Sequence, residues 1–193
     1  LEGFDPELYD ISQKQQYETV NVYSFNTNSR KGDFYFGSET IYNSVYSEAV
    51  SWEGVWGVGD TRYPPEGSSL FSTAYYVNTF QRLSYKLQLE AGMRYTYSHI
   101  KGAFPDFIHM DLLAVEGMKL SSENSILSGN IKFVYYPSDS WKLSSVTSRG
   151  FHAPNVDDML KIFVKGGHIT VPNIDLKPEY ALSQELSISK NVG

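Results

Sequence analysis

The sequence predicts an all-β protein, an antiparallel up-and-down transmembrane β-barrel of which this chain is a contiguous arc of about seven strands. Three features predict this fold. Apolar and polar residues alternate with a period of two, aromatic residues make up 15% of the 193-residue chain, and short connections between predicted strands alternate with long ones. The chain contains no run of about 18 apolar residues, which excludes a membrane-spanning helix, but a barrel strand turns only every second residue toward lipid.

The clearest predicted strand lies at residues 85–100. Its odd positions, from Leu87 to Tyr97, are apolar or aromatic, whereas its even positions include Gln88, Glu90 and Arg94. A strand with this pattern has one apolar and one polar face. At about 3.3 Å per residue it spans roughly 50 Å, which is longer than ordinary globular strands and fits a barrel strand that projects beyond the bilayer.

The other strands are predicted, in chain order, at residues 15–28, 33–49, 70–83, 124–136, 140–150 and 179–190. Within 33–49, one face carries aromatic rings near both ends and small polar residues between them, namely Phe34, Phe36, Ser38, Thr40, Ser44, Tyr42 and Tyr46. Rings at both ends are expected of aromatic girdles at the two membrane interfaces. In the last strand, Gln184 interrupts an otherwise apolar stripe.

One short helix is predicted at residues 155–163. Asn155 is suited to be its N-cap, and Asp157 and Asp158 would lie in its first turn, where carboxylates favour the helix dipole.

The connections indicate which end of each strand faces which side of the membrane. Residues 28–32, 83–84 and 137–139 are short, whereas 50–69, 101–123 and 151–178 are long. Outer-membrane barrels alternate in this way, with short periplasmic turns and long extracellular loops. An odd number of strands does not close a bacterial single-chain barrel, and a strand lies close to each end of the chain, so we expect an arc of a larger barrel.

Composition excludes several classes of function. The absence of cysteine excludes disulfides and thiolate metal sites, and the net charge of -6 argues against nucleic acid as a partner. The sequence has no nucleotide-binding loop and no catalytic Ser/His/Asp pattern, so we expect no enzyme.

Two late segments carry a family resemblance. Residues 148–158, SRGFHAPNVDD, resemble the GFRAPNVDDL segment of TonB-dependent outer-membrane receptors, and residues 171–180, VPNIDLKPEY, are similar to the NPDLKPE box of the same family. Residues 61–67 and 87–97 are similar to earlier barrel segments of these receptors. The chain departs from the family pattern at His152, where arginine is usual, and at Ile174, which replaces a proline of the box.

The resemblance implies that residues 1–193 are part of the barrel domain of a receptor in the bacterial outer membrane. It implies a barrel of the 22-strand type, with a plug domain and a TonB box that this chain lacks. It further implies import of an iron chelate, haem or a ferric siderophore, with energy from TonB. The expected partners are TonB, outer-membrane lipid and the chelate, and no permanently bound cofactor is expected.

His168 and His152 are the candidate ligand-binding residues. Both lie in the long connection 151–178, His152 within the first family-like segment and His168 between the two segments. In haem receptors of the family, a histidine between these segments is an axial ligand of the iron, so the resemblance implies this role for His168 first and for His152 second. The alternative for each is a solvated loop histidine.

Two other functions remain open from the residues alone. A soluble β-rich carbohydrate-binding module would use exposed tryptophan and tyrosine rings as sugar platforms. A passive porin would share the barrel but lack the plug. The sequence favours the receptor because the strands are long and the lengths of the connections alternate regularly.

Overall fold

The computed structural model of the protein describes residues 14–51, 63–64, 66–104, 119–161, 163–165 and 168–192. Seven long strands form one sheet in the order β1-β2-β3-β4-β5-β6-β9. They are β1 (Lys14–Lys31), β2 (Phe34–Ser51), β3 (Ser68–Arg82), β4 (Leu87–Ala103), β5 (Lys119–Ser138), β6 (Trp141–His152) and β9 (Glu179–Lys190). Helix α1 (Val156–Leu160) and a two-stranded sheet of β7 (Phe163–Lys165) and β8 (His168–Thr170) lie between β6 and β9 in the chain.

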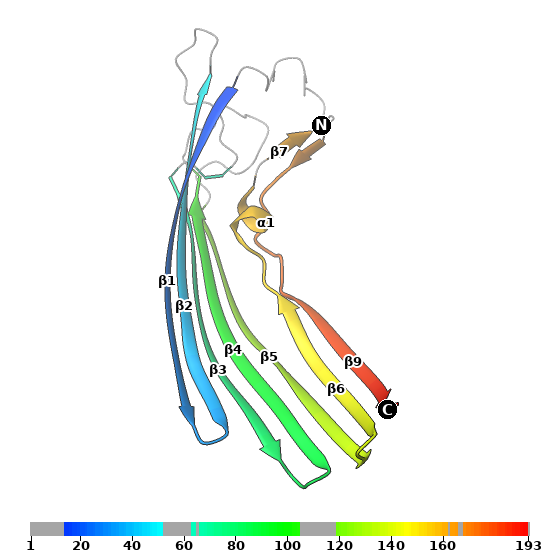
Figure 1. The fold of residues 1–193 in the computed structure, drawn as a ribbon. Coiled ribbons are helices and arrows are strands. Elements are labelled where there is room, and N and C mark those ends of the chain that lie inside the picture. The colour runs from blue at the N-terminus through cyan, green and yellow to red at the C-terminus, as the bar shows by residue number, and fades with distance from the viewer. Residues whose placement is uncertain are drawn as a thin grey trace.

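Every neighbouring pair in the large sheet is antiparallel, which confirms the predicted meander. The strands run side by side and curve together, and α1 and β7 lie at the end of the sheet drawn at the top of Figure 1, here called the upper end. The short turns lie at the lower end. β1 and β9 form the two edges of the sheet.

The turns at the lower end are short because their residues suit tight reversals. In the turn between β1 and β2, Gly32 has φ 61, a left-handed conformation that costs glycine nothing, and its carbonyl oxygen accepts a hydrogen bond from Arg30 Nε at 2.9 Å. Between β3 and β4, the Ser84 hydroxyl accepts from the backbone N–H groups of Lys86 and Leu87 at 3.2 and 3.1 Å. These contacts hold adjacent strands in register.

Several strands extend further than predicted. The clearest case is β5, which begins at Lys119 rather than at residue 124. The added residues, Lys119 to Glu123, are almost entirely polar, so no apolar face reveals them as strand. The three-residue strands β7 and β8 were not predicted, because three residues are too few to show an alternating pattern.

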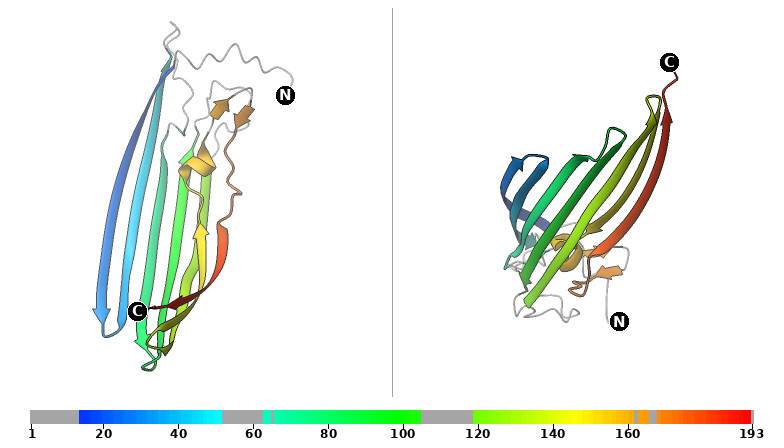
Figure 2. Two further views of the ribbon diagram at one scale, coloured as in Figure 1. Left: turned by 45° about the vertical axis from the view of Figure 1, so that its right-hand side comes forward. Right: turned by 90° about the horizontal axis from the view of Figure 1, so that it is seen from below.

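The two faces of the sheet are distinguished by where α1 packs. Ile100 belongs to the apolar cluster that contains α1, and a Cβ added at Gly102 would meet Leu160 Cδ1 at 2.6 Å. The even positions of β4 therefore face the side of α1, which is the concave side of the curved sheet (Figure 2). We call this side the lumenal face and the opposite side the outer face.

The outer face carries the apolar residues, as predicted. On β4 the outer positions include Leu89, Met93 and Tyr95, and Gln88, Glu90 and Arg94 lie on the lumenal face. Large apolar side chains remain exposed on the outer face, among them Phe36, Tyr42, Tyr75, Met93, Leu127, Ile131, Phe133, Leu182, Leu186 and Ile188. A sheet with such a large exposed apolar surface is stable when that surface contacts lipid, not when it contacts water.

Hydroxyl groups on the outer face bond to one another across neighbouring strands. Thr27 Oγ1 lies 2.8 Å from Ser38 Oγ, and Thr40 Oγ1 lies 3.1 Å from Thr73 Oγ1. Each pair joins directly opposed residues, so neither hydroxyl depends on water for a partner. Polar residues are therefore tolerated within the apolar face. Among the described residues, no helix has both the length and the apolar character needed to cross a membrane.

Met93 lies in the middle of the outer face, 53% exposed, between Val77 of β3 and Gly129 of β5. We expect Met93→Lys in the full-length receptor to cost about 2–4 kcal/mol in free energy of unfolding, because it places a charge near the bilayer midplane. Urea unfolding of the receptor in lipid bilayers measures this cost.

Ser144→Lys is the matched control, since Ser144 lies on the lumenal face of β6 and its substitution puts the same charge toward the lumen. The control is expected to change the stability by less than about 1 kcal/mol. Equal costs for the two variants would contradict the assignment of the faces.

Candidate functional site

The N-terminus of helix α1 is stabilised by hydrogen bonds between residues close together in the sequence. The Asn155 side chain accepts a hydrogen bond from the backbone N–H of Asp158 at 3.1 Å, and the Asp158 carboxylate accepts one from the backbone N–H of Asn155 at 3.0 Å. This capping box confirms the predicted N-cap. The helix ends at Leu160 rather than at residue 163, because Phe163 already belongs to β7.

An apolar cluster fixes α1 to the lumenal face at the upper end. Met159 and Leu160 are fully buried, with 0% and 1% of their surface exposed. The buried members of the cluster are Tyr63, Ile100, Phe104, Leu120, Val156, Met159 and Leu160, and Val45, Leu70, Ile174 and Leu176 pack against them. They come from separate connections and from four strands, so the cluster joins the loops to the inner wall of the sheet.

Polar contacts at Asp157 extend the same attachment. The Tyr63 hydroxyl donates to Asp157 Oδ1 at 2.5 Å, and Lys161 Nζ lies 3.3 Å from Asp157 Oδ2. The backbone N–H of Asn173 donates to the carbonyl oxygen of Met159 at 2.9 Å. The segments around Tyr63, α1 and Asn173 are therefore fastened together over the lumenal face.

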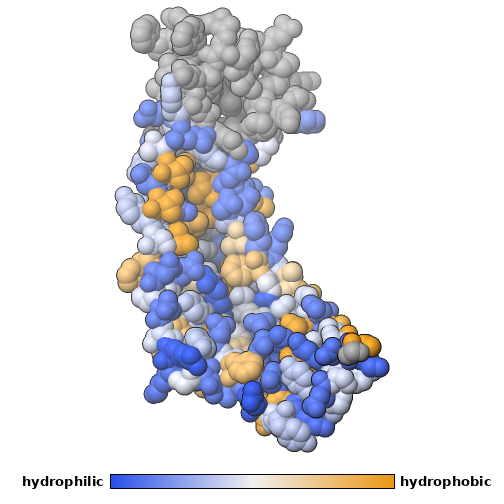
Figure 3. Space-filling model, viewed as in Figure 1, coloured by the Kyte–Doolittle hydropathy of each residue, from blue (hydrophilic) through white to orange (hydrophobic). Residues whose placement is uncertain are grey.

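Below this cluster the lumenal face is polar and hollowed. A hollow of about 660 Å³ is lined from the lumenal side by Glu39, Tyr76, Asn78, Arg94, Ser128 and Asn130. Figure 3, seen from the same side as Figure 1, shows hydrophilic residues predominating over the lower half of the strands. A wall of this kind suits water, a polar domain or a polar solute rather than lipid.

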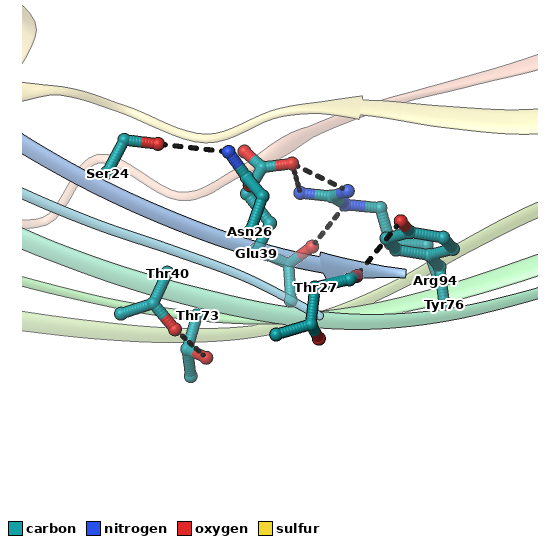
Figure 4. A network of polar contacts seen from close by, with 9 residues as sticks. Ser24, Asn26, Thr27, Glu39, Thr40, Thr73, Tyr76 and Arg94 are labelled. Carbon is teal, nitrogen blue, oxygen red and sulfur yellow. Dashed lines mark hydrogen bonds and ion pairs between the residues drawn. The ribbon is translucent and has the colours of Figure 1, made fainter. Parts of the chain in front are cut away.

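Two ion pairs cross strands on this wall. Arg94 Nη1 and Nη2 both donate to Glu39 Oε2, at 3.2 and 3.1 Å, and Lys132 Nζ lies 3.0 Å from Glu90 Oε2. Figure 4 shows Arg94 and Glu39 on one side of the sheet and the Thr40–Thr73 pair on the other. About a third of each side chain of the Arg94–Glu39 pair is exposed, so the pair orients the guanidinium more than it stabilises the fold.

The ring of Tyr76 lies over Gly37 on the same wall. A Cβ added at Gly37 would meet the Tyr76 hydroxyl oxygen at 2.5 Å and the Thr27 carbonyl oxygen at 2.2 Å. Only glycine leaves room for the ring, whose hydroxyl reaches the Thr27 carbonyl oxygen at 3.4 Å. Gly92 makes similar room between the amides of Asn78 and Asn130.

The structure places the two candidate histidines in different sheets. His152 is the last residue of β6 and pairs in register with Glu179 of β9, and His168 is the first residue of β8, opposite Lys165 of β7. Both side chains are exposed. No hydrogen bond or ion pair joins them, and the described residues contain no group of three His, Cys, Asp or Glu side chains placed to hold a metal ion.

The sequence did not identify the lumenal ion pairs or the apolar cluster. The alternation does place Glu39, Glu90, Arg94 and Lys132 at positions that prove to be lumenal. Their pairing depends on the register, which joins Glu90 directly to Lys132 and which the pattern alone does not give.

A sheet of long antiparallel strands, apolar outside and polar inside, with loops folded onto its inner face at one end, is the wall of an outer-membrane receptor barrel. The family model "TonB dependent receptor-like, beta-barrel" matches residues 3–191, and the chain therefore belongs to this family. Barrels of this family lie in the bacterial outer membrane, so the predicted family and location are confirmed.

Solved structures of similar fold agree. The chain is similar to the copper transporter OprC, with TM-score 0.64 and 14% identity, covering 93% of this chain and 28% of that one. It is also similar to the siderophore receptor PiuA from Acinetobacter baumannii, with TM-score 0.52 and 10% identity, covering 91% and 29%. A third is the Serratia marcescens hemophore receptor HasR, in complex with its hemophore HasA and heme, with TM-score 0.53 and 16% identity, covering 91% and 29%.

The chain thus spans less than a third of each of these proteins. No curated protein matches its sequence. At such low identities the likeness concerns the fold, and the fold is the predicted one, an all-β arc of a larger barrel. The family match selects the transport receptor over a carbohydrate-binding module or a passive porin, and the family is one of transport receptors rather than enzymes.

Leu160 is the fully buried contact between α1 and the lumenal face. We expect Leu160→Ala in the full-length receptor to weaken the docking of α1 by about 2–5 kcal/mol, because it leaves a cavity in the cluster. Hydrogen exchange of the amides of residues 156–161 should become correspondingly faster.

Leu186→Ala serves as the control, since Leu186 lies on the outer face of β9 and is 77% exposed in this chain. It should leave the exchange in α1 unchanged. Unaltered protection of α1 in Leu160→Ala would show that the cluster does not hold the helix.

Proposed function

We propose that the receptor to which this chain belongs imports an iron chelate, haem or a ferric siderophore, across the outer membrane with energy from TonB. The chain supplies part of the barrel wall, and the plug domain and TonB-contacting segment belong to the whole receptor. Outer-membrane lipid contacts the outer face. Haem or siderophore is the transported ligand, not a resident cofactor.

The observation that carries the proposal is the placement of the two histidines at the upper end. The segment 151–178 is fastened to the lumenal face through α1, and it carries His152 at one end and His168 in its middle. Exposed imidazoles on a loop held at the entrance of a polar lumen are in reach of a ligand that arrives from outside. Imidazole is a common protein ligand of haem iron, so haem is the first ligand to test.

The similar structures do not choose among ligands. Their names refer to copper, a siderophore, and a hemophore with heme, at 10–16% identity. A shared barrel carries different loops and hence different specificities. A ferric siderophore is therefore the second candidate, and it requires no histidine ligand.

The test is a haem titration of the full-length receptor in detergent. We expect His168→Ala to shift the Soret band and to weaken haem binding by about tenfold or more. Removing a residue that merely orients a metal ligand already lowers metal affinity by about tenfold, and removing the axial ligand itself should lower the affinity at least as much. His152→Ala is expected to produce the same kind of change if that residue supplies the second axial ligand.

His99→Ala is the matched control, because His99 lies on the outer face and its Nε2 is 2.9 Å from Ser121 Oγ. It should bind haem as the parent does. If both His168→Ala and His152→Ala keep the parent's Soret band and affinity, haem ligation by this segment is wrong. Uptake of radiolabelled iron as haem or as ferric siderophore, in cells with and without TonB, then identifies the chelate and its energy source.

A further inference from the structure

Four buried polar atoms lie on the lumenal face near α1. They are Asn43 Oδ1, Ser68 Oγ, Ser98 Oγ and Asn124 Nδ2, and none has a hydrogen-bond partner in the described part of the chain. The register places all four side chains on the side of the sheet on which α1 packs. Among the described residues, the buried side-chain atoms without a partner thus gather at one end of one face.

Ser68 lies directly beneath the docked helix. Gly102 of β4 pairs with Ser68 in the register, and a Cβ added there would meet Leu160 Cδ1 at 2.6 Å, Pro64 Cγ at 3.3 Å and Ser68 Oγ at 3.3 Å. Ser68 and Leu160 are only 4% and 1% exposed. The Ser68 hydroxyl group is therefore covered in part by apolar side chains, which cannot bond to it.

The other three atoms border the apolar pair of Leu70 and Ile100, which packs against α1. Leu70 pairs with Ile100 in the register, and Asn43 pairs with Leu70 from the next strand. Ser98 precedes Ile100 by two residues on the same face of β4, and Asn124 pairs with Ser98. Polar groups buried in a permanent core are almost always paired, so the wall under α1 differs from such a core.

These four atoms oppose the docking of α1. They are sealed from solvent and no space for a water molecule adjoins them, so each loses its hydrogen bonds to water without gaining one in the protein. Release of the segment 151–178 would return water to them. The burial of Met159 and Leu160 favours the docked position, and the unpaired polar atoms reduce that preference.

The polar contacts that hold α1 do little to offset this cost. The ion pair of Lys161 with Asp157 lies near the surface, since 46% of the Asp157 side chain is exposed. Such pairs contribute little to stability, because water solvates both charges when the pair is broken. The hydrogen bond from Tyr63 to Asp157 can likewise be exchanged for bonds to water once the segments part.

We propose that the segment 151–178 is a lid that is poised to release from the lumenal wall, with Asn43, Ser68, Ser98 and Asn124 as the groups that favour release. The structure shows the docked position, and hydration of these four groups stabilises the released one. The lid lies above the polar hollow of the wall, at the upper end of the sheet (Figure 1). The inference concerns conformation and holds whichever ligand is transported, so it goes beyond the proposed import of haem or siderophore.

The test measures hydrogen exchange in the full-length receptor in detergent, without added ligand. We expect the double variant Ser68→Ala, Ser98→Ala to slow exchange of the amides of residues 156–161 by about tenfold or more. Alanine removes the unpaired hydroxyl group and keeps Cβ, and one unpaired group of this kind disfavours docking by about fivefold or more. This change is opposite in sign to the one expected for Leu160→Ala.

The matched control is Ser128→Ala, Ser148→Ala, which makes the same change at two lumenal serines that keep contact with water. Exchange in α1 should then equal that of the parent. Unchanged or faster exchange in Ser68→Ala, Ser98→Ala would show that the hydroxyl groups do not oppose docking, and would overturn the proposal. Equal slowing of the amides of β5 would reveal a change in the stability of the whole sheet, and would overturn it as well.

Discussion

The requirement that backbone N–H and C=O groups find partners without water governs this structure. In a bilayer only the neighbouring strand can supply them, and the strands from β1 to β5 pair residue by residue along nearly their whole length. This pairing fixes the register, and the register decides which side chains meet lipid. A slip of one residue in β4 would turn Arg94 toward lipid and Met93 toward the lumen.

The same period of two explains how much could be predicted. Strands were found wherever one face meets lipid, because there the alternation is visible in residues such as Leu89 and Glu90. It vanishes beyond the bilayer, where both faces are wet, and so the start of β5 at Lys119 was missed. The partners of Arg94 and Lys132 were also beyond reach, since pairing depends on the register between strands distant in sequence.

The loops were harder to predict for a related reason. The cap of α1 was predicted because Asn155 and Asp158 are three residues apart and act locally. The cluster that holds the helix was not predicted, because Tyr63, Phe104 and Leu160 come from distant segments without a common pattern. The resemblance to a family singled out His168 and His152. Both side chains are exposed, so neither is needed to pack the fold, and both are free to contact a ligand.

The attachment of α1 has a consequence for movement at the entrance of the barrel. Its apolar side chains cover Ile100 and Leu120, so lifting the helix would expose apolar surface on the helix and on the wall at once. A small displacement of the helix would already break these apolar contacts, so we expect the docked and released positions of α1 to be two distinct states. Because Tyr63 and Asn173 both form hydrogen bonds with the α1 segment, we expect a ligand that contacts Tyr63 to affect α1 and the backbone at Asn173 as well.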